Sequence, residues 1–250
     1  MPRIALISDI HGNLEALDAV LKDIAQDHVD RVCCLGDIVG YGPDPGQCIE
    51  VVFTVCDKMV LGNHEEALLR SGVLNSFNPR ARQAIDITRQ LLSDDHMAML
   101  ESIPDVAKID ELTLAHASFG PVQYEYLATE EAVDRSFEGL RTKYGAVGHT
   151  HIPGVFSREM SILGGSSEPI FEIMLGSTSV PIRPNTRAIM NPGSVGQPRD
   201  RNPDASWGIF DTDDMRFEIR RVAYDVDATQ AKIARLGMPS FHGERLKMGA

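Results

Sequence analysis

Short apolar runs alternate with amphipathic stretches through the first 70 residues. The runs "RIALIS" (3–8), "RVCCLG" (31–36) and "KMVLG" (58–62) predict buried strands. Residues 13–26 place apolar side chains at helical spacing on one face, namely Leu14, Leu17, Val20, Leu21 and Ile24. A Gly/Pro-rich loop leads into a short helix near 47–55, and another helix starts at 63. This alternation predicts parallel strands joined by right-handed crossovers.

The pattern changes after residue 70. Residues 71–103 look helical, with Asn78, Ser93 or Asp94 as candidate caps, and form either a small helical cap beside a ligand site or a long crossover. Apolar runs then predict strands at 105–118, 144–151, 161–175, 187–195, 206–213 and 216–224. We expect the later, hairpin-linked runs to form a second, mixed sheet. Helices are expected at 129–141 and 226–237, and residues 239–250 read as a tail of one α/β domain that spans 1–250.

Composition restricts the classes of function. The formal charge of −12 argues against broad binding to nucleic acid, which needs a basic surface. A small anionic substrate stays compatible with it, because bound metal ions reverse the local sign of a cleft. The sequence contains no apolar run that approaches the length of a membrane span and no signal-peptide pattern, so we expect a cytoplasmic protein. Without paired spacing, Cys33, Cys34, Cys48 and Cys56 are expected to be reduced thiols.

Polar side chains follow five of the apolar runs, at the strand ends where open parallel sheets bind ligands. These residues are Asp9, His11, Asp37, Asn63, His64, His116, His149 and His151, which include five of the eight histidines. One histidine after a strand is more often a hydrogen-bonded structural residue. Five strand ends of this kind are hard to explain by packing, because an unpaired buried polar group costs about 1–3 kcal/mol. The set therefore predicts a metal centre.

The types of ligand narrow the choice of metal. Carboxylate, imidazole and amide groups without thiolate suit Mn²⁺, iron, Co²⁺ or Zn²⁺ rather than a Cys-rich structural zinc site. Seven candidate ligands exceed the needs of one ion. With one bridging carboxylate they suit two ions about 3.5–4 Å apart, the arrangement used for phosphoryl transfer.

Five short blocks in order, "DIHGN", "GDIVGYG", "GNHE", "AHAS" and "GHTH", together resemble the calcineurin-like metallophosphoesterase superfamily. The resemblance runs from residue 4 to about residue 200. The block "NPGSVGQPRD" (191–200) resembles the compact prokaryotic phosphodiesterase branch, which includes enzymes active on phosphodiesters and on diadenosine tetraphosphate. Two positions depart from the family. Ala115 replaces a glycine that often precedes the histidine of the fourth block, and "GDIVGYGPDP" lacks the Asp-Arg typical of phosphoprotein phosphatases, which disfavours that activity.

The resemblance implies a four-layer αββα sandwich of two mixed sheets flanked by helices, with a dinuclear metal site at the strand C-terminal ends. It assigns Asp9, His11 and His151 to the first metal and Asn63, His116 and His149 to the second, with Asp37 bridging. The cofactors implied are two divalent or trivalent transition-metal ions (Mn, Fe, Zn, Co or Ni), with manganese favoured for activity. His64 is not a ligand in this pattern and would stabilise charge or protonate the leaving oxygen.

Further residues have two interpretations each. Asn13 either orients a ligand or caps a helix. The glycines around Asn191 and Ser194 either bring backbone N–H groups to an anion or form a tight turn. Arg199 and Arg201 either contact substrate phosphates or lie in solvent, and Tyr41 either stacks on a base or packs locally.

These observations favour a metal-dependent phosphoesterase that hydrolyses a small phosphodiester, phosphomonoester or nucleotide by attack of a metal-activated water. The alternative is a catalytically silent metal-binding scaffold of the same fold, as one retromer subunit of the superfamily is. Such relatives are expected to lose ligands or the histidine of the third block, and this sequence keeps all eight residues. Acidic composition and the lack of a basic, aromatic-interleaved stretch disfavour a DNA nuclease.

Overall fold

The computed structural model describes residues 2–70, 72–160 and 167–250. The strands are β1 (Arg3–Ile7), β2 (Arg31–Cys34), β3 (Lys58–Met59), β4 (Val106–Ile109), β5 (Leu112–Ala115), β6 (Tyr144–Ala146), β7 (Gly154–Glu159), β8 (Ile170–Ile173), β9 (Thr178–Pro181), β10 (Thr186–Asn191), β11 (Ala205–Asp211) and β12 (Arg216–Val222). The helices are α1 (Leu14–Ile24), α2 (Pro45–Val55), α3 (Asn63–Leu69), α4 (Pro79–Leu91), α5 (Asp94–Glu101), α6 (Glu130–Gly139), α7 (Val226–Arg235) and α8 (Ser240–Glu244), with 3₁₀ turns η1 (Val73–Ser76) and η2 (Arg245–Lys247).

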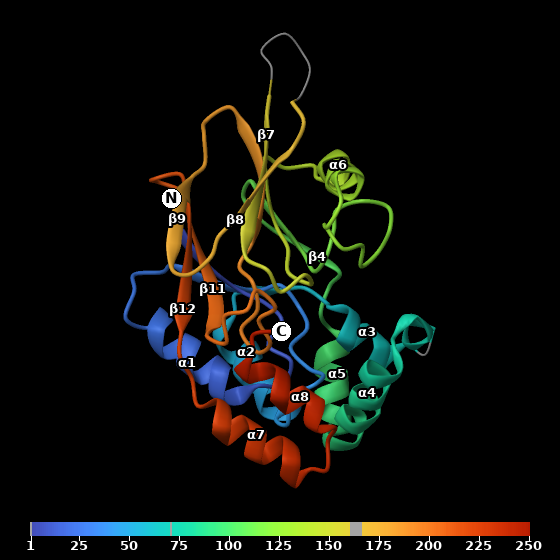
Figure 1. The fold of residues 1–250 in the computed structure, drawn as a ribbon. Helices are drawn as coiled ribbons and strands as arrows, with labels where there is room; N and C mark the ends of the chain where they lie inside the picture. The colour runs from blue at the N-terminus through green and yellow to red at the C-terminus, as the bar shows by residue number, and fades with distance from the viewer. Residues whose placement is uncertain (1, 71, 161–166) are drawn as a thin grey trace.

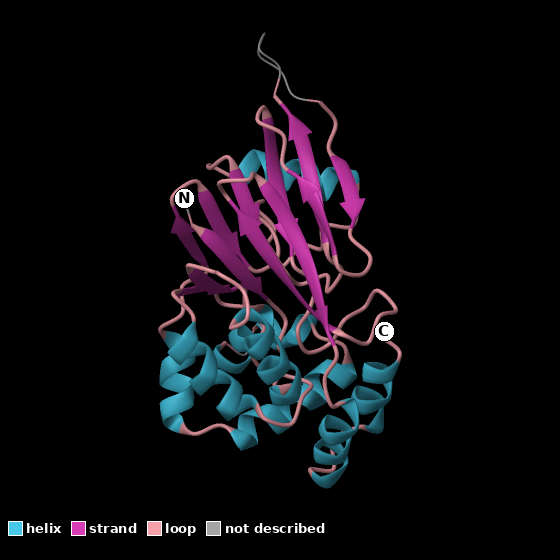
Figure 2. Ribbon diagram, turned by 90° about the vertical axis from the view of Figure 1, so that its left-hand side faces the viewer, coloured by secondary structure: helices cyan, strands magenta, loops and turns pink. Residues whose placement is uncertain are grey.

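These strands form two six-stranded mixed sheets, with helices concentrated at one end of the molecule and α6 set apart beside the second sheet (Figures 1 and 2). The first sheet has the order β3–β2–β1–β11–β12–β9, and the second has the order β4–β5–β6–β10–β7–β8. Strands β1, β2 and β3 are mutually parallel, as are β5, β6 and β10. Within each parallel group the C-terminal ends meet at one edge, where loops can share a site.

Alternation along the strands builds the layers. In β1, Ile4 and Leu6 belong to the core between the two sheets, whereas Ala5 and Ile7 pack against the helices that cover the first sheet. In β10, Ile189 instead packs against α6 on the outer face of the second sheet. The four-layer αββα architecture follows from these three cores.

The predicted β–α–β–α–β–α order of the first 70 residues is confirmed, with boundaries within a few residues of those expected. Asn78 and Ser93 both act as helix caps, because their side chains accept hydrogen bonds from the backbone N–H of Ala81 and His96. All four cysteines are free thiols, and three of them are buried. Burial raises the pKa of Cys33 to about 12.

Two expectations for the second half of the chain are wrong, and one lies partly outside the described residues. The runs at 206–213 and 216–224 do not join the second sheet, because β11 and β12 extend the first sheet as antiparallel neighbours of β1. The segment expected to be a tail instead folds into α8 and η2, and its His242 is buried. Residues 161–166 of the run at 161–175 are not described, and β8 occupies its later part.

Residues 72–103 connect α3 to β4 and also form one wall of the pocket described below, through Phe77, Asn78 and Ala81. Within the described ranges, no helix combines the length and the apolar character needed to cross a membrane.

Candidate metal centre

Six of the predicted ligands stand on loops that leave the C-terminal ends of β1, β2, β5 and β6, and the seventh, Asn63, begins α3 after β3. Five of them adopt a left-handed backbone conformation with φ between 51° and 66°, namely Asp9, His11, Asp37, His149 and His151. Such a conformation costs an L-residue roughly 1–2 kcal/mol, so it marks positions that the surrounding structure holds for a purpose. None of the seven predicted ligands is more than 9% exposed.

The first group of donor atoms comes from both sheets. Ligand atoms of Asp9, His11, Asp37 and His151 all lie within 4.8 Å of one another. Nε2 of His11 lies 3.1 Å from Nε2 of His151, which in turn is 3.3 Å from Oδ1 of Asp9. Backbone bonds between the loops support this approach, since the N–H of His11 donates to the carbonyl of Asp37 over 2.9 Å.

The hydrogen bonds of the ring nitrogens show that this group suits a cation. Nδ1 of His11 faces the carbonyl oxygen of Val39 at 3.1 Å, and Nδ1 of His151 faces that of Gln197 at 2.6 Å. A carbonyl only accepts, so both Nδ1 atoms carry the proton and both Nε2 atoms present lone pairs. Two lone pairs 3.1 Å apart repel each other unless a positive ion lies between them. The backbone carbonyls thus orient these imidazoles so that both could bind a metal ion.

The second group has the same character. Nδ1 of His116 donates to the carbonyl of Leu35 over 2.7 Å, which directs its Nε2 toward Oδ1 of Asn63 and Nδ1 of His149, each at 3.1 Å. Asp37 joins this group as well, with Oδ2 at 3.3 Å from Nε2 of His116. This donor set has two imidazoles, an amide oxygen and a carboxylate but no thiolate, and it suits a transition-metal ion.

Asp37 lies between the two groups. Its Oδ2 is 3.7 Å from Nε2 of His11 and 3.3 Å from Nε2 of His116, while its Oδ1 accepts a hydrogen bond of 2.9 Å from the backbone N–H of His64. One oxygen therefore faces both groups and the other is fixed by the backbone. This is the arrangement that a bridging carboxylate requires.

The electrostatics of three of the four imidazoles agree with a ligand role, whereas for His116 the Asp37 carboxylate outweighs burial and raises the pKa to about 9. Burial would raise the pKa of Asp37, but the imidazoles of His116 and His64 outweigh it and hold that pKa well below its usual range. Burial lowers the pKa of His149 to about 3 and those of His11 and His151 well below 6.5. These rings are neutral at pH 7, the form in which imidazole binds metals.

His64 begins α3 and lies against the centre without belonging to either donor group. Its ring centroid is 4.7 Å from that of His11 and 4.5 Å from that of Tyr41. Gly40 makes room for it, because a Cβ there would stand 2.1 Å from Nδ1 of His64. The ring is buried, and burial lowers its pKa to about 4.

Glu65 was not identified from the sequence, although it braces the centre. Its fully buried carboxylate accepts hydrogen bonds from the backbone N–H groups of Asp37 at 2.9 Å, Val39 at 3.0 Å and Gly62 at 2.9 Å. These contacts fix the loop that presents Asp37 against the start of α3. The only signal in the sequence was an acidic residue two positions after Asn63, where a capping role would also place it.

A cavity of about 320 Å³ opens onto the centre. Besides ligands and His64, it is lined by Tyr41, Phe77, Asn78, Ala81, Gln123, Tyr124, Tyr126 and Arg199. The ring of Tyr126 lies 4.1 Å from that of His149 and is half exposed. Buried Glu66 holds the loop opposite, since it accepts hydrogen bonds from Gln123 and from the hydroxyl of Tyr124. Gln123, Tyr124 and Tyr126 carried no motif by which the sequence could identify them.

Some of the remaining candidate residues line the cavity, and others stabilise the structure around it. Arg199 and Tyr41 line the cavity, whereas Arg201 is exposed and lies outside its lining. Asn13 caps α1 by accepting from the N–H of Ala16, and it also donates to the carbonyl of Gly196. Its side chain lies outside the cavity lining.

The loop after β10 supports the other loops. Asn191 donates from Nδ2 to the carbonyl of Gly148 over 2.8 Å, and Ser194 donates to the carbonyl of Asp9 over 2.7 Å. The N–H groups of Val195 and Gly196 also donate to β1 and its following loop, so they are not available to an anion. Of the two interpretations given above for the glycines near Asn191 and Ser194, the hydrogen bonds favour the tight turn. The turn also connects the "GHTH" loop to Asp9.

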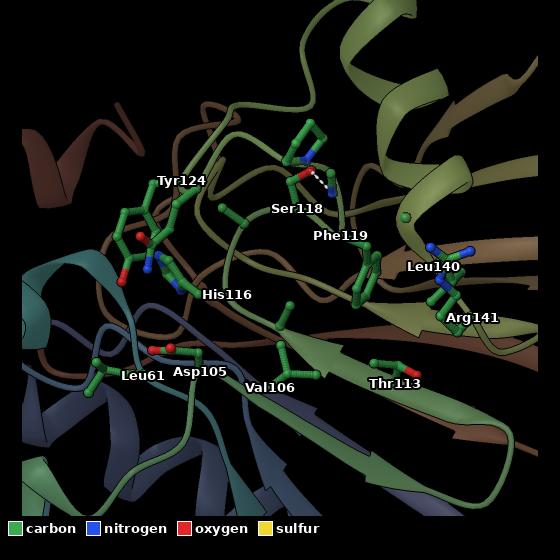
Figure 3. A pocket seen from close by; sticks show the side chains of 16 residues that line it. Leu61, Asp105, Val106, Thr113, His116, Ser118, Phe119, Tyr124, Leu140 and Arg141 are labelled. Carbon is green, nitrogen blue, oxygen red and sulfur yellow. Dashed lines mark hydrogen bonds between the residues drawn. The ribbon is translucent and has the colours of Figure 1, made fainter.

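A second cavity, of about 370 Å³, lies between β4, β5 and α6 and meets the centre at His116 and Tyr124 (Figure 3). Its walls include Val106, Phe119 and Leu140, with Asp105 and Arg141 as its charged members. Figure 3 shows Tyr124 and His116 at one end of this cavity and Arg141 at the other.

Comparison with known proteins places the centre in context. A family model of the calcineurin-like phosphoesterase superfamily domain matches residues 3–215. The chain is 38% identical over 254 residues to an uncharacterized protein of Methanocaldococcus jannaschii, covering 98% of each chain. It is also 29% identical over 140 residues to a symmetrical bis(5'-nucleosyl)-tetraphosphatase of Chromohalobacter salexigens, covering 53% of this chain and 52% of that protein.

Among solved structures, a metallophosphoesterase from Sphaerobacter thermophilus has a TM-score of 0.86 at 38% identity, covering 100% of this chain and 99% of that chain. A hypothetical protein from Pyrococcus horikoshii OT3 has a TM-score of 0.77 at 18% identity, covering 100% and 99%, and shows the same fold. With the family model over most of its length and full-length relatives at 38% identity, the chain belongs to the calcineurin-like phosphoesterase superfamily.

Proposed function

We propose that the protein is a dinuclear metal-dependent phosphoesterase that hydrolyses a small phosphodiester, phosphomonoester or nucleotide. The observation that carries the proposal is the position of Asp37, whose Oδ2 faces donor groups from both sheets within 3.7 Å. Membership of the phosphoesterase superfamily supports hydrolysis of phosphoester bonds as the reaction.

Two groups of residues would hold the metals. Asp9, His11 and His151 would bind one ion, Asn63, His116 and His149 the other, and Asp37 both. When bound, a pair of ions supplies Lewis acidity toward phosphoryl oxygens and lowers the pKa of an attacking water. Manganese is the metal that we propose for activity, among the oxygen- and nitrogen-preferring ions that this donor set accepts.

The chain's own side chains would perform the remaining steps. Arg199 lines the cavity and would bind a phosphoryl oxygen through its guanidinium group. His64 would stabilise the charge on the leaving oxygen or protonate it. The exposed Tyr126 and the half-buried Tyr41 flank the same cavity, and either ring would stack on a nucleobase. Similarity over half the chain to a bis(5'-nucleosyl)-tetraphosphatase supports a nucleotide among the candidate substrates.

Turnover of a simple diester tests the proposal. Purified protein supplied with Mn²⁺ is expected to hydrolyse bis-(p-nitrophenyl) phosphate, with two equivalents of metal bound per chain. The Asp37→Asn variant serves as the inactive comparison. If no turnover occurs with Mn²⁺, Co²⁺, Ni²⁺ or Zn²⁺, the protein is instead the silent scaffold of this fold.

A panel of substrates then narrows the class. It runs from p-nitrophenyl phosphate through cyclic nucleotides to dinucleoside polyphosphates. The monoester tests phosphomonoesterase activity, and the nucleotides test whether the tyrosines contribute to binding.

A further inference from the structure

A cavity of about 570 Å³ adjoins the metal pocket on the side of the C-terminal helices. It shares Tyr41, Asn78, Ala81, Tyr126 and Arg199 with that pocket, so the two spaces are continuous. Its other walls come from the start of α4 and from α8 and η2, which Figure 1 shows in red near the C-terminus. We call this space the arginine annex, after Arg80, Arg199 and Arg245, which line it.

The charge of the annex is opposite to that of the whole chain. Three guanidinium groups line it and no Asp or Glu does, in a chain of net charge −12. Among the described residues, no Asp or Glu carboxylate lies within 4.0 Å of any of the three as an ion-pair partner, and Nε of Arg245 donates a hydrogen bond to the oxygen of Ala250. Arginines on an acidic protein usually find carboxylates, as Arg221 does with Asp200 here. Three arginines around one space, none of them with an Asp or Glu partner, indicate an anion site.

The arginines are held in place rather than free in solvent. The guanidinium carbons of Arg80 and Arg245 lie 4.3 Å and 5.3 Å from the ring centroid of Phe241. Arg199 donates from Nη2 to Oε1 of Gln197, while its Nε is buried without a partner in the described part of the chain. Burial and the neighbouring Arg199 lower the pKa of Arg245 to about 10. An anion between these two guanidinium groups would relieve their repulsion.

The cavity of about 370 Å³ shown in Figure 3 is less suited to bind an anion. Its walls are mainly apolar, and they include a single arginine, Arg141, with the carboxylate of Asp105 near the opposite end of the cavity. No Asp or Glu lines the annex, and α4 adds the positive end of a 13-residue helix at Asn78 and Pro79.

We propose that the substrate carries at least two phosphate groups and that the arginine annex binds the one that is not cleaved. This inference rests on the proposed function, since it places the scissile phosphate in the metal pocket. It narrows the substrate class to compounds with a phosphate chain or a second phosphate, such as nucleoside di- or polyphosphates. Arg80 and Arg245 are then residues that determine substrate specificity.

The test compares two ligands that differ by one phosphate. Adenosine 5'-monophosphate and 5'-diphosphate compete against bis-(p-nitrophenyl) phosphate on the Mn²⁺-loaded protein, with free Mn²⁺ held constant. The wild type is expected to bind the diphosphate at least about tenfold more tightly, since each added charge-assisted contact is a strong hydrogen bond. The double variant Arg80→Gln/Arg245→Gln should bring the ratio of the two inhibition constants close to one.

The matched control is Arg235→Gln, which removes the same charge from an exposed position at the end of α7 and should keep the wild-type ratio. A wild type without preference, or a double variant that retains it, would overturn the inference. Should the protein not hydrolyse the diester, titration calorimetry of the same two nucleotides gives the ratio directly. Failure of the proposed function is thereby separated from failure of the annex.

Discussion

Five of the predicted metal ligands share a backbone conformation that residues with a Cβ normally avoid. Backbone hydrogen bonds hold them there, as when the N–H groups of Asp9 and His11 donate to the carbonyls of Gly36 and Asp37. The loops themselves therefore hold these residues in this conformation. Ligands held in this way lose little conformational entropy on binding, which strengthens the affinity for metal.

Asp37 is the residue on which both donor groups depend. We expect Asp37→Asn to bind neither metal and to lose activity, because the amide has no negative charge to offer two cations. Metal content by mass spectrometry is the measurement. Asp86→Asn, an exposed position on α4, is the control and should retain two ions. An Asp37→Asn protein that still carried both metals would contradict the bridging role.

His64 is expected to behave differently. The variant His64→Ala should keep both metals while kcat falls by about 10²-fold or more, the range for loss of an acid–base group. Its backbone N–H, which bonds to Asp37, stays in place. His28→Ala, at an exposed position, should have the wild-type rate. A His64→Ala protein empty of metal would show that our division of roles is wrong.

At the scale of the elements, α3 begins at the centre and is fastened to it by Glu65. In Glu65→Ala the three backbone N–H groups of Asp37, Val39 and Gly62 lose their acceptor. Since each unpaired buried group costs about 1–3 kcal/mol, we expect the free energy of unfolding to fall by at least about 3 kcal/mol. Thermal unfolding followed by circular dichroism measures the change.

The free energy of unfolding of Glu65→Gln should lie between those of the wild type and Glu65→Ala, because the amide keeps one oxygen acceptor. Glu101→Ala, at the exposed end of α5, is the matched control and should unfold near the wild-type temperature. Equal stability of the Glu65→Ala and Glu101→Ala proteins would exclude the bracing role.

The elements also show what the sequence could predict. Local periodicity located the strands and helices of the first 70 residues, and the ligand-type residues at strand ends located the centre. The partners of β11 could not be found in this way, because its alternating pattern is satisfied equally well in either sheet. No local sequence pattern indicated that α8 lines the annex either. Only the tertiary fold brings the ring centroid of His242 to 5.1 Å from that of Tyr41.

For the whole molecule, the centre joins loops from both sheets, so metal binding and folding should be linked. Metal at about a thousandfold excess over its Kd stabilises by about 4 kcal/mol, which for a chain of this size raises Tm by about 8–16 °C. Removal of metal with a chelator is expected to lower Tm by that amount, as differential scanning calorimetry would show. The Asp37→Asn protein should melt at one temperature with or without chelator. A chelator-insensitive wild type would mean that the centre binds metal weakly or not at all.

The carbonyl of Leu35, on the first sheet, accepts the hydrogen bond that orients His116, on the second. The spacing of the two sheets thus sets the spacing of the two donor groups. The packing of Leu6, Phe210 and Met190 in the core between the sheets would therefore influence the distance between the two donor groups. Substitutions there, far from any phosphate, would shift the separation of the ions and with it the reaction rate. Among homologues, such interior changes offer a way to alter metal preference and turnover while every ligand is conserved.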